Sequence, residues 1–132
     1  MIIDQKFLDE LSAQAKANPR LRQNYDFRTS SEDSSQRMLN ALEVGTVLPI
    51  HRHTKSTETL VMVRGKLREY FYNDNGEVIE SILLEAGGEI PMLQVPVGQW
   101  HSVEVLEEGT IIFEAKDGAY EPLIQSDIRR SI

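Results

Sequence analysis

The chain has 132 residues, of which 40% are hydrophobic and 27% are charged, and its formal net charge is −7 at pH 7. This length predicts one domain, and this composition is typical of an ordinary globular protein. The negative charge argues against a nucleic-acid partner, because such proteins hold phosphates with clustered lysines and arginines. The chain has no membrane-length apolar run and no cysteine, so we expect no membrane partner, disulfide or thiolate metal site. The first residues lack the pattern of a signal peptide, so a cytoplasmic location is expected.

Residues 1–35 predict a helix, an edge strand and a polar loop. Asp4 can cap a helix whose apolar residues keep helical spacing, and Pro19 ends it. We expect this helix to cover one flank or an open edge of a sheet. Residues 21–27 alternate loosely, as an edge strand does, and the polar residues 29–35 are expected to form a solvated connection.

From residue 36 onward, short strands alternate with turn residues. Between two of the strands, Asn75-Gly76 predicts a hairpin, because this pair tolerates the positive φ angles of tight turns. Strands this short and this regularly spaced are typical of a sandwich or barrel. The predicted strands are 36–44, 48–53, 58–63, 66–72, 78–84, 89–95, 100–106 and 110–115.

All three histidines of the chain fall in two short motifs. His51 and His53 have the same parity in a predicted strand, so they project from one face, and Glu58 can return on the next strand to meet them. His101 follows a Pro-x-Gly turn far along the chain. Three imidazoles and one carboxylate suit a mid-series divalent ion, with a coordination position left for water or substrate. We predict one ion, Fe2+, Zn2+, Mn2+ or Ni2+, at these four residues; a closed structural metal site is the alternative.

The same residues resemble the two motifs of the cupin superfamily. The first motif is met in full between Gly45 and Gly65, whereas the second is met at its proline, glycine and histidine but departs in one loop length and one asparagine position. The resemblance implies an all-β fold, a single cupin barrel (a double-stranded β-helix or jelly roll) with an N-terminal helix. The matches in the second motif are Pro96, Gly98 and His101, and the departures are at Gly88 and Val105.

A closer resemblance, to the WbuC-type cupin metalloproteins, covers most of the chain up to Tyr120. That family is associated with bacterial surface-polysaccharide gene clusters. The domain organisation expected from it is an N-terminal helix and edge segment at 1–35, a cupin barrel at 36–120 and a C-terminal tail at 121–132. Because cupins often pair through sheet edges, we expect a homodimer. The resemblance rests on residues 37–43, on Lys55, on Glu58-Thr59, on Trp100-His101 and on 113–120.

Further polar residues are candidates for contact with a ligand. Glu114 and Lys116 share one face of the last strand, which reads first as an exposed face carrying an ion pair. The WbuC-type resemblance instead implies catalytic roles for Glu114, Lys116 and Tyr120, as an acid/base and an anion anchor. A closed sheet in which these groups face inward would place them beside the metal.

Substrate-binding candidates are Arg37, Lys55 and Gln99. The two cations suit a carboxylate or phosphate, although solvated surface charges are the plain alternative. Gln99 has the parity of His101 and is expected to face inward with it. Trp100 has the opposite parity and is expected to pack outside the barrel or at a subunit interface.

The leading functional hypothesis is an enzyme acting on a small-molecule ligand, a sugar or nucleotide sugar of bacterial surface-polysaccharide metabolism. The reaction would be an isomerisation, an epimerisation or another step assisted by Lewis-acid polarisation of a carbonyl. An Fe(II) dioxygenase is one alternative. A non-catalytic sensor or small-ligand binding domain, which would need a partner in order to signal, is another.

Overall fold

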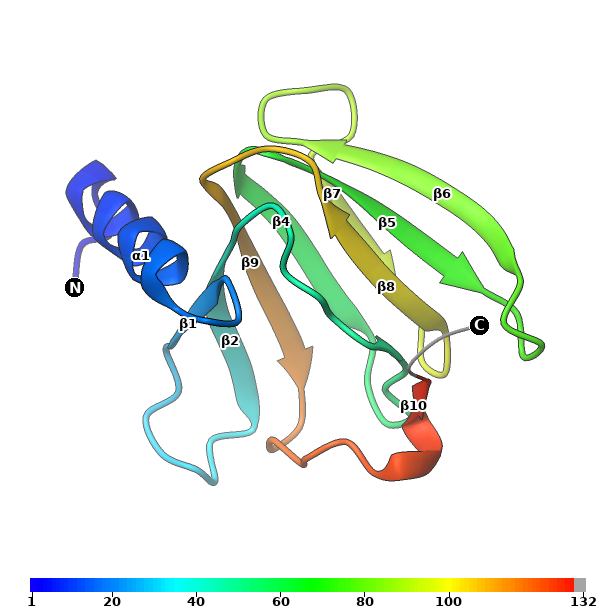
Figure 1. Cartoon of the computed structure of the whole chain (residues 1–132). Coiled ribbons are helices and arrows are strands. Elements are labelled where there is room, and N and C mark those ends of the chain that lie inside the picture. The colour runs from blue at the N-terminus through cyan, green and yellow to red at the C-terminus, as the bar shows by residue number, and fades with distance from the viewer. Residues whose placement is uncertain (130–132) are drawn as a thin grey trace.

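The computed structural model describes residues 1–129. Two five-stranded antiparallel sheets face each other, and one helix lies outside them (Figure 1). The strand order is β1-β2-β9-β4-β7 in the first sheet and β10-β3-β8-β5-β6 in the second, so neighbouring strands come from distant parts of the chain. The elements are α1 Gln5–Ala17, β1 Arg22–Asp26, β2 Ser35–Leu42, β3 Ile50–His51, β4 Glu58–Arg64, β5 Lys66–Tyr72, β6 Val78–Glu85, β7 Met92–Val95, β8 Trp100–Val105, β9 Thr110–Asp117, η1 Gln125–Asp127 and β10 Ile128–Arg129.

The predicted N-terminal helix is confirmed, and it covers the outer face of the first sheet at the side of the edge strand β1. An oxygen of Asp4 accepts a hydrogen bond from the backbone N–H of Phe7 at 2.9 Å and so caps α1. The apolar stripe of the helix packs on the outer face of the first sheet, against β1, β2 and β9 (Figure 1). The buried residues of this contact are Leu8, Leu11, Ala15, Leu39, Ala41 and Ile111.

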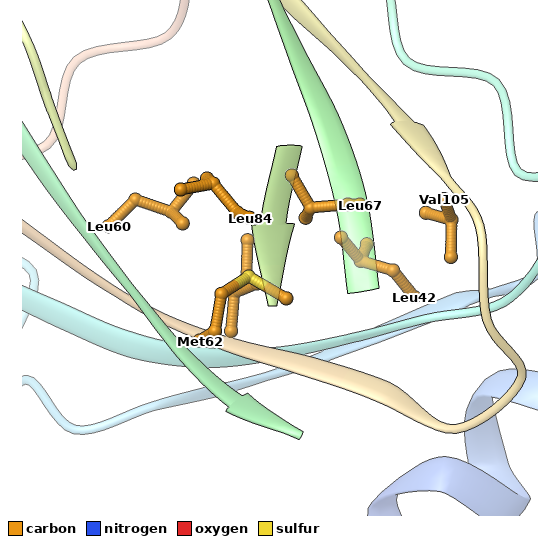
Figure 2. Close-up of a cluster of buried hydrophobic side chains, with 7 residues drawn as sticks. Leu42, Leu60, Met62, Leu67, Leu84 and Val105 are labelled. Atoms are coloured by element: carbon orange, nitrogen blue, oxygen red, sulfur yellow. The ribbon is translucent and has the colours of Figure 1, made fainter. Parts of the chain in front are cut away.

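The main apolar core lies between the inner faces of the two sheets. Side chains from strands of both sheets meet there, as Figure 2 shows. Burying one such leucine contributes roughly 1.5–3 kcal/mol, so this cluster is the main cohesion between the sheets. The strand register places it at one end of the interior, which leaves the other end for polar side chains. The cluster consists of Leu42, Leu60, Met62, Leu67, Leu84, Val105 and Ile112.

Three local features differ from the sequence-based expectation. The ligand-bearing strand β3 is limited to residues 50–51 rather than 48–53, and β7 begins only after Pro91, which has no N–H for a ladder bond. In the hairpin after β5, only Gly76 takes a positive φ, of 81°, so Asn75 does not adopt the conformation that the Asn-Gly pair predicted.

Part of the segment 121–132, which was predicted as a C-terminal tail, pairs with the second sheet. The short helix η1 leads into β10, in which Ile128 pairs with His51 and Arg129 pairs with Ile50. Residues 130–132 of the predicted tail lie outside the described residues. A two-residue strand has too little hydrophobic periodicity to be found from sequence.

Candidate metal centre

The three histidines converge at the polar end of the interior. His51 of β3 lies directly across from His101 of β8 in the antiparallel ladder, and their ring centroids are 4.2 Å apart. The ring of His53, just after β3, lies 5.0 Å from His51 and 5.7 Å from His101. One ligand atom from each histidine lies within 4.8 Å of the other two. Metal–nitrogen bonds of about 2.0–2.1 Å are compatible with this grouping.

Glu58 reaches the same point from the opposite sheet. It begins β4, and one of its carboxylate oxygens lies 3.3 Å from Nε2 of His53 and 3.7 Å from Nε2 of His101. Its side chain is buried, as is that of His101. The structure therefore brings together all four predicted ligands. The three histidines approach from the second sheet, and Glu58 approaches from the first.

The hydrogen bonds of two imidazoles fix which nitrogen faces the centre. Nδ1 of His51 lies 3.0 Å from the carbonyl oxygen of Pro49, and Nδ1 of His101 lies 2.9 Å from that of Gln99. Because a carbonyl oxygen only accepts, each Nδ1 carries the proton, and each neutral ring offers the Nε2 lone pair. This arrangement, with one ring nitrogen anchored by a backbone carbonyl, is common for metal-binding histidines.

One specific observation supports the binding of a divalent cation by these four residues. Nε2 of His101 is buried and has no hydrogen-bond partner within residues 1–129. A lone pair in that position faces the carboxylate of Glu58, so two acceptors confront each other unless a proton or a cation lies between them. Three imidazoles and a carboxylate suit Fe2+, Zn2+, Mn2+ or Ni2+.

The charge states at the centre also suit metal binding. Burial and the neighbouring His101 lower the pKa of His51 to about 4. Burial alone would raise the pKa of Glu58, but the adjacent imidazoles of His101 and His53 and the charge of Lys116 outweigh it, so the pKa lies below its usual value. At neutral pH, His51 is therefore neutral and Glu58 ionised, as metal ligands must be.

These residues line a cavity of about 670 Å³ at the polar end of the interior. Segment 118–124, which links β9 to η1, also borders the cavity. The wall has apolar and polar portions. The apolar residues include Leu48, Leu60, Val103 and Ile112, and the polar residues beyond the four predicted ligands include Gln36, Asn40, Glu69, Glu114 and Lys116.

The three predicted catalytic residues all line this cavity. Lys116 lies directly across from Glu58 in the β4–β9 ladder, and Glu114 is one inward position further along β9. Burial, and next the charge of Glu58, raise the pKa of Glu114 to about 8 against the opposing effect of Lys116. Tyr120 is 51% exposed, and the guanidinium carbon of Arg28 lies 5.3 Å from its ring centroid. The alternative interpretation of Glu114 and Lys116 as an exposed face does not agree with this placement.

Two of the three substrate-binding candidates do not reach the cavity. Arg37 alternates with the inward Gln36 in β2, and its guanidinium instead contacts Asp33 at 3.1 Å. Gln99 precedes β8, and its amide donates to two backbone carbonyls at 2.9 Å each. Lys55 does line the cavity, but its amine is exposed and pairs with a glutamate, Glu121, at 2.8 Å.

Three lining residues were not foreseen as site residues. Glu69 lies in a strand whose charges alternate with aromatic residues, so it resembled a surface position, although its parity with Leu67 in that strand was the available signal. Gln36 is buried, and its amide donates to the carbonyl of Gly118 at 2.9 Å. Asn40 follows the inward parity of Gln36 in β2.

Trp100 lies outside the inner space, as its parity predicted, but it is covered by the chain's own C-terminal segment. The guanidinium carbons of Arg52 and Arg129 each lie 4.5 Å from its ring centroid, and only 4% of the residue is exposed. Arg52 also pairs with Asp127 of η1 at 2.9 Å. The loop that carries His51 and His53 is thereby attached to the segment that follows the barrel.

Arg52→Ala is expected to lower the free energy of unfolding by about 1–2 kcal/mol, because the change removes a cation from the ring of Trp100 and leaves the buried carboxylate of Asp127 unpaired. Urea unfolding followed by circular dichroism measures this difference. Arg20→Ala, at an exposed arginine, is the matched control. Equal stability of the two variants would contradict the attachment described here.

The fold and the grouped histidines define a class, and solved structures agree with it. The chain is similar to the capsular polysaccharide assembling protein CapF from Staphylococcus aureus, with 22% identity, a TM-score of 0.65, and coverage of 82% of this chain and 31% of CapF. It is similar to KdgF from Halomonas sp., with 15% identity, a TM-score of 0.59, and coverage of 76% of this chain and 82% of KdgF. It is also similar to a mutant of Bacillus subtilis oxalate decarboxylase OxdC, with 22% identity, a TM-score of 0.54, and coverage of 65% of this chain and 22% of OxdC. The protein thus has the cupin fold, and it spans less than a third of the length of CapF.

The chain belongs to the family described as "Domain of unknown function (DUF6016)", whose model matches residues 3–84. No curated protein sequence matches the chain. Within residues 1–129, no helix combines the length and the apolar character needed to cross a membrane.

Proposed function

We propose that this protein is a metal-dependent enzyme that acts on a sugar or nucleotide sugar in bacterial surface-polysaccharide metabolism. One observation carries the proposal: Nε2 of His101, which has no hydrogen-bond partner among residues 1–129, faces Glu58 inside a cavity that Glu114 and Lys116 also line. His51, His53, Glu58 and His101 would hold one divalent ion, Fe2+, Zn2+, Mn2+ or Ni2+. Such an ion supplies Lewis-acid polarisation of a substrate oxygen.

The chain's own side chains would bind the substrate and move protons. Glu114 has a pKa near the operating pH, so it can release a proton and take it back during one turnover. Lys116 provides a positive charge beside it for a phosphate or carboxylate of the substrate. The hydroxyl of Tyr120 would act at the same mouth of the cavity, and the apolar wall would limit access of water.

The substrate class is supported by context rather than by a contact. CapF is described as a capsular polysaccharide assembling protein, and the WbuC-type resemblance points to the same area of metabolism. We further propose a cytoplasmic homodimer without nucleic-acid or membrane partners. Pairing would use β6 or β7, which are edge strands of the two sheets.

The metal-loaded protein should convert at least one member of a panel of nucleoside-diphosphate sugars and free sugars, as followed by NMR. A chelator should stop the conversion, and one added metal should restore it. Conversion that continues without oxygen would separate an isomerase or epimerase from an Fe(II) dioxygenase. A fully loaded protein that neither converts nor binds any member of the panel would contradict the proposal.

Lys116→Met is expected to lower kcat/KM by about 10- to 100-fold on an anionic substrate, because a charged hydrogen bond contributes roughly 1.5–3 kcal/mol. Its metal content should stay unchanged. Lys6→Met, at an exposed lysine on α1, is the matched control. Wild-type kinetics in the Lys116 variant would show that this lysine does not contribute to substrate binding or turnover.

A further inference from the structure

Glu69 is a buried acid that the metal centre does not use. It belongs to β5, none of its surface is exposed, and it lines the same cavity as the histidines. Both of its carboxyl oxygens lack a hydrogen-bond partner within residues 1–129. Since a buried polar group without a partner is costly to the fold, a partner from inside the cavity is the natural explanation.

The strand register places Glu69 next to the predicted metal ligands, on the inner side. In the second sheet, Phe71 lies across from His101, and Glu69 lies across from Val103, one inward position further from the mouth. In the first sheet, Glu114 lies across from Leu60, one inward position beyond the Glu58–Lys116 pair. The two extra carboxyl groups therefore come from opposite sheets and lie at the same depth below the metal centre.

Polar groups around the two acids are few, and most carry no positive charge. The nearby polar wall residues of β2 are the amides Gln36 and Asn40. Lys116 is a cation on β9, the strand that also carries Glu114. Leu60 and Ile112, which belong to the apolar core, and Val103, which packs against it, also line the cavity. A ligand at this depth meets hydrogen-bonding groups on two sides and an apolar floor.

The charge state of the acids favours a neutral, hydroxyl-bearing ligand over a second cation. Burial, and then the charge of Glu58, raise the pKa of Glu69 well above its usual value. Glu114 also holds its proton at neutral pH. A protonated carboxyl both donates and accepts a hydrogen bond, which matches the donor and acceptor capacity of a hydroxyl.

We propose that Glu69 and Glu114 form a hydroxyl-binding subsite that orients the polyhydroxylated ring of a monosaccharide below the metal centre, with Glu69 as its specificity-determining residue. This inference rests on the proposed function. It assigns the inner half of the cavity to the hydroxyl groups of the ligand and the outer half, with Lys116, to its charged group.

The test compares two carboxylate probes, D-glucuronate and hexanoate, of which only the first carries hydroxyl groups. Isothermal titration of the Mn2+-loaded protein gives the Kd of each probe. Wild type should bind D-glucuronate at least about 10-fold more tightly than hexanoate, since one net hydrogen bond contributes roughly that factor. Glu69→Leu should lose this preference, whereas Glu69→Gln, which keeps a donor and an acceptor, should retain it within about 3-fold.

A stability measurement separates a binding role from a structural one. Because the apolar leucine removes a buried group without a partner, Glu69→Leu should raise Tm by about 3 °C or more while it weakens the preference. Glu80→Gln, at an exposed glutamate of β6, should change neither quantity. A lower Tm in both Glu69 variants, or an unchanged preference in Glu69→Leu, would overturn the subsite.

Metal content distinguishes failure of this inference from failure of the proposed function. If wild type retains no metal after loading and desalting, the metal-dependent function fails, and the subsite that rests on it fails too. If wild type retains metal but binds the two probes equally, the subsite alone is wrong. The wild-type metal content is therefore measured on the same samples as the titrations.

Discussion

His101→Ala is expected to reduce metal retention from about one ion per chain to a trace. The change removes an imidazole whose buried Nε2 has no hydrogen-bond partner in the described part of the chain and whose Nδ1 is anchored on the Gln99 carbonyl. Loss of an outer hydrogen bond to a ligand already weakens metal binding by about 10- to 100-fold, so loss of the ligand itself should weaken it further. Plasma mass spectrometry of protein loaded with one equivalent of Zn2+ and then desalted measures the content.

A control on the same strand excludes a general effect on folding. Glu104→Ala alters an exposed, outward residue of β8 and should retain metal as wild type does. Circular dichroism should show that both variants remain folded. Full metal content in folded His101→Ala would remove this histidine from the ligand set and, with it, the basis of the proposed centre.

Acidification of the metal-free protein from pH 7 to pH 4 is expected to remove about 3 kcal/mol of stability through His51 alone. The pKa of His51 is about 4 in the folded protein against 6.5 in its unperturbed state. Below pH 6.5, His51 takes up a proton in the unfolded chain but stays neutral in the folded chain. The stability contribution present above pH 6.5 is therefore lost as pH falls toward 4. Glu58 adds to the loss at lower pH, because its folded pKa also lies below its usual value.

Urea unfolding at pH 7, 5.5 and 4 measures this slope, and His51→Gln isolates it. The variant cannot take up the proton, so the difference between wild type and variant should shrink by about 3 kcal/mol over this range. Glu114 acts in the opposite sense: its contribution is fully present below pH 4.5 and is lost as pH rises through about 8. Parallel pH profiles for wild type and His51→Gln would show that His51 is not held neutral by its surroundings.

Local patterns predict the strands and the His51–His53 pair, whereas the cupin resemblance implied the cupin barrel, and the approach of His101 depends on the pairing of β3 with β8. A His-x-His pair in an extended segment, a Pro-x-Gly turn before His101 and short punctuated strands each have one geometric outcome. The helix cap at Asp4 is likewise a local contact. The helix cap and the His51–His53 pair required no knowledge of which strands are neighbours.

The residues that sequence analysis misplaced depend on parity and on distant packing. Arg37 and Gln36 are adjacent, and only the register of β2 against β9 determines which one faces inward. Glu69 was missed because it lies between Arg68 and Tyr70, in a strand whose alternating charged and aromatic residues resemble a solvated strand. The cover over Trp100 depends on a strand of two residues that forms only against β3.

The two sheets are joined differently at their two ends. At one end the apolar cluster packs them together, and at the other the carboxylate of Glu58 faces the histidines across the cavity. An ion held by these residues would link the two sheets at the cavity end, whereas the apolar cluster holds the sheets together at the other end without an ion. Breathing motions of the metal-free protein should therefore concentrate at the mouth, around β3 and η1, while the packed end keeps its amide protons protected from exchange.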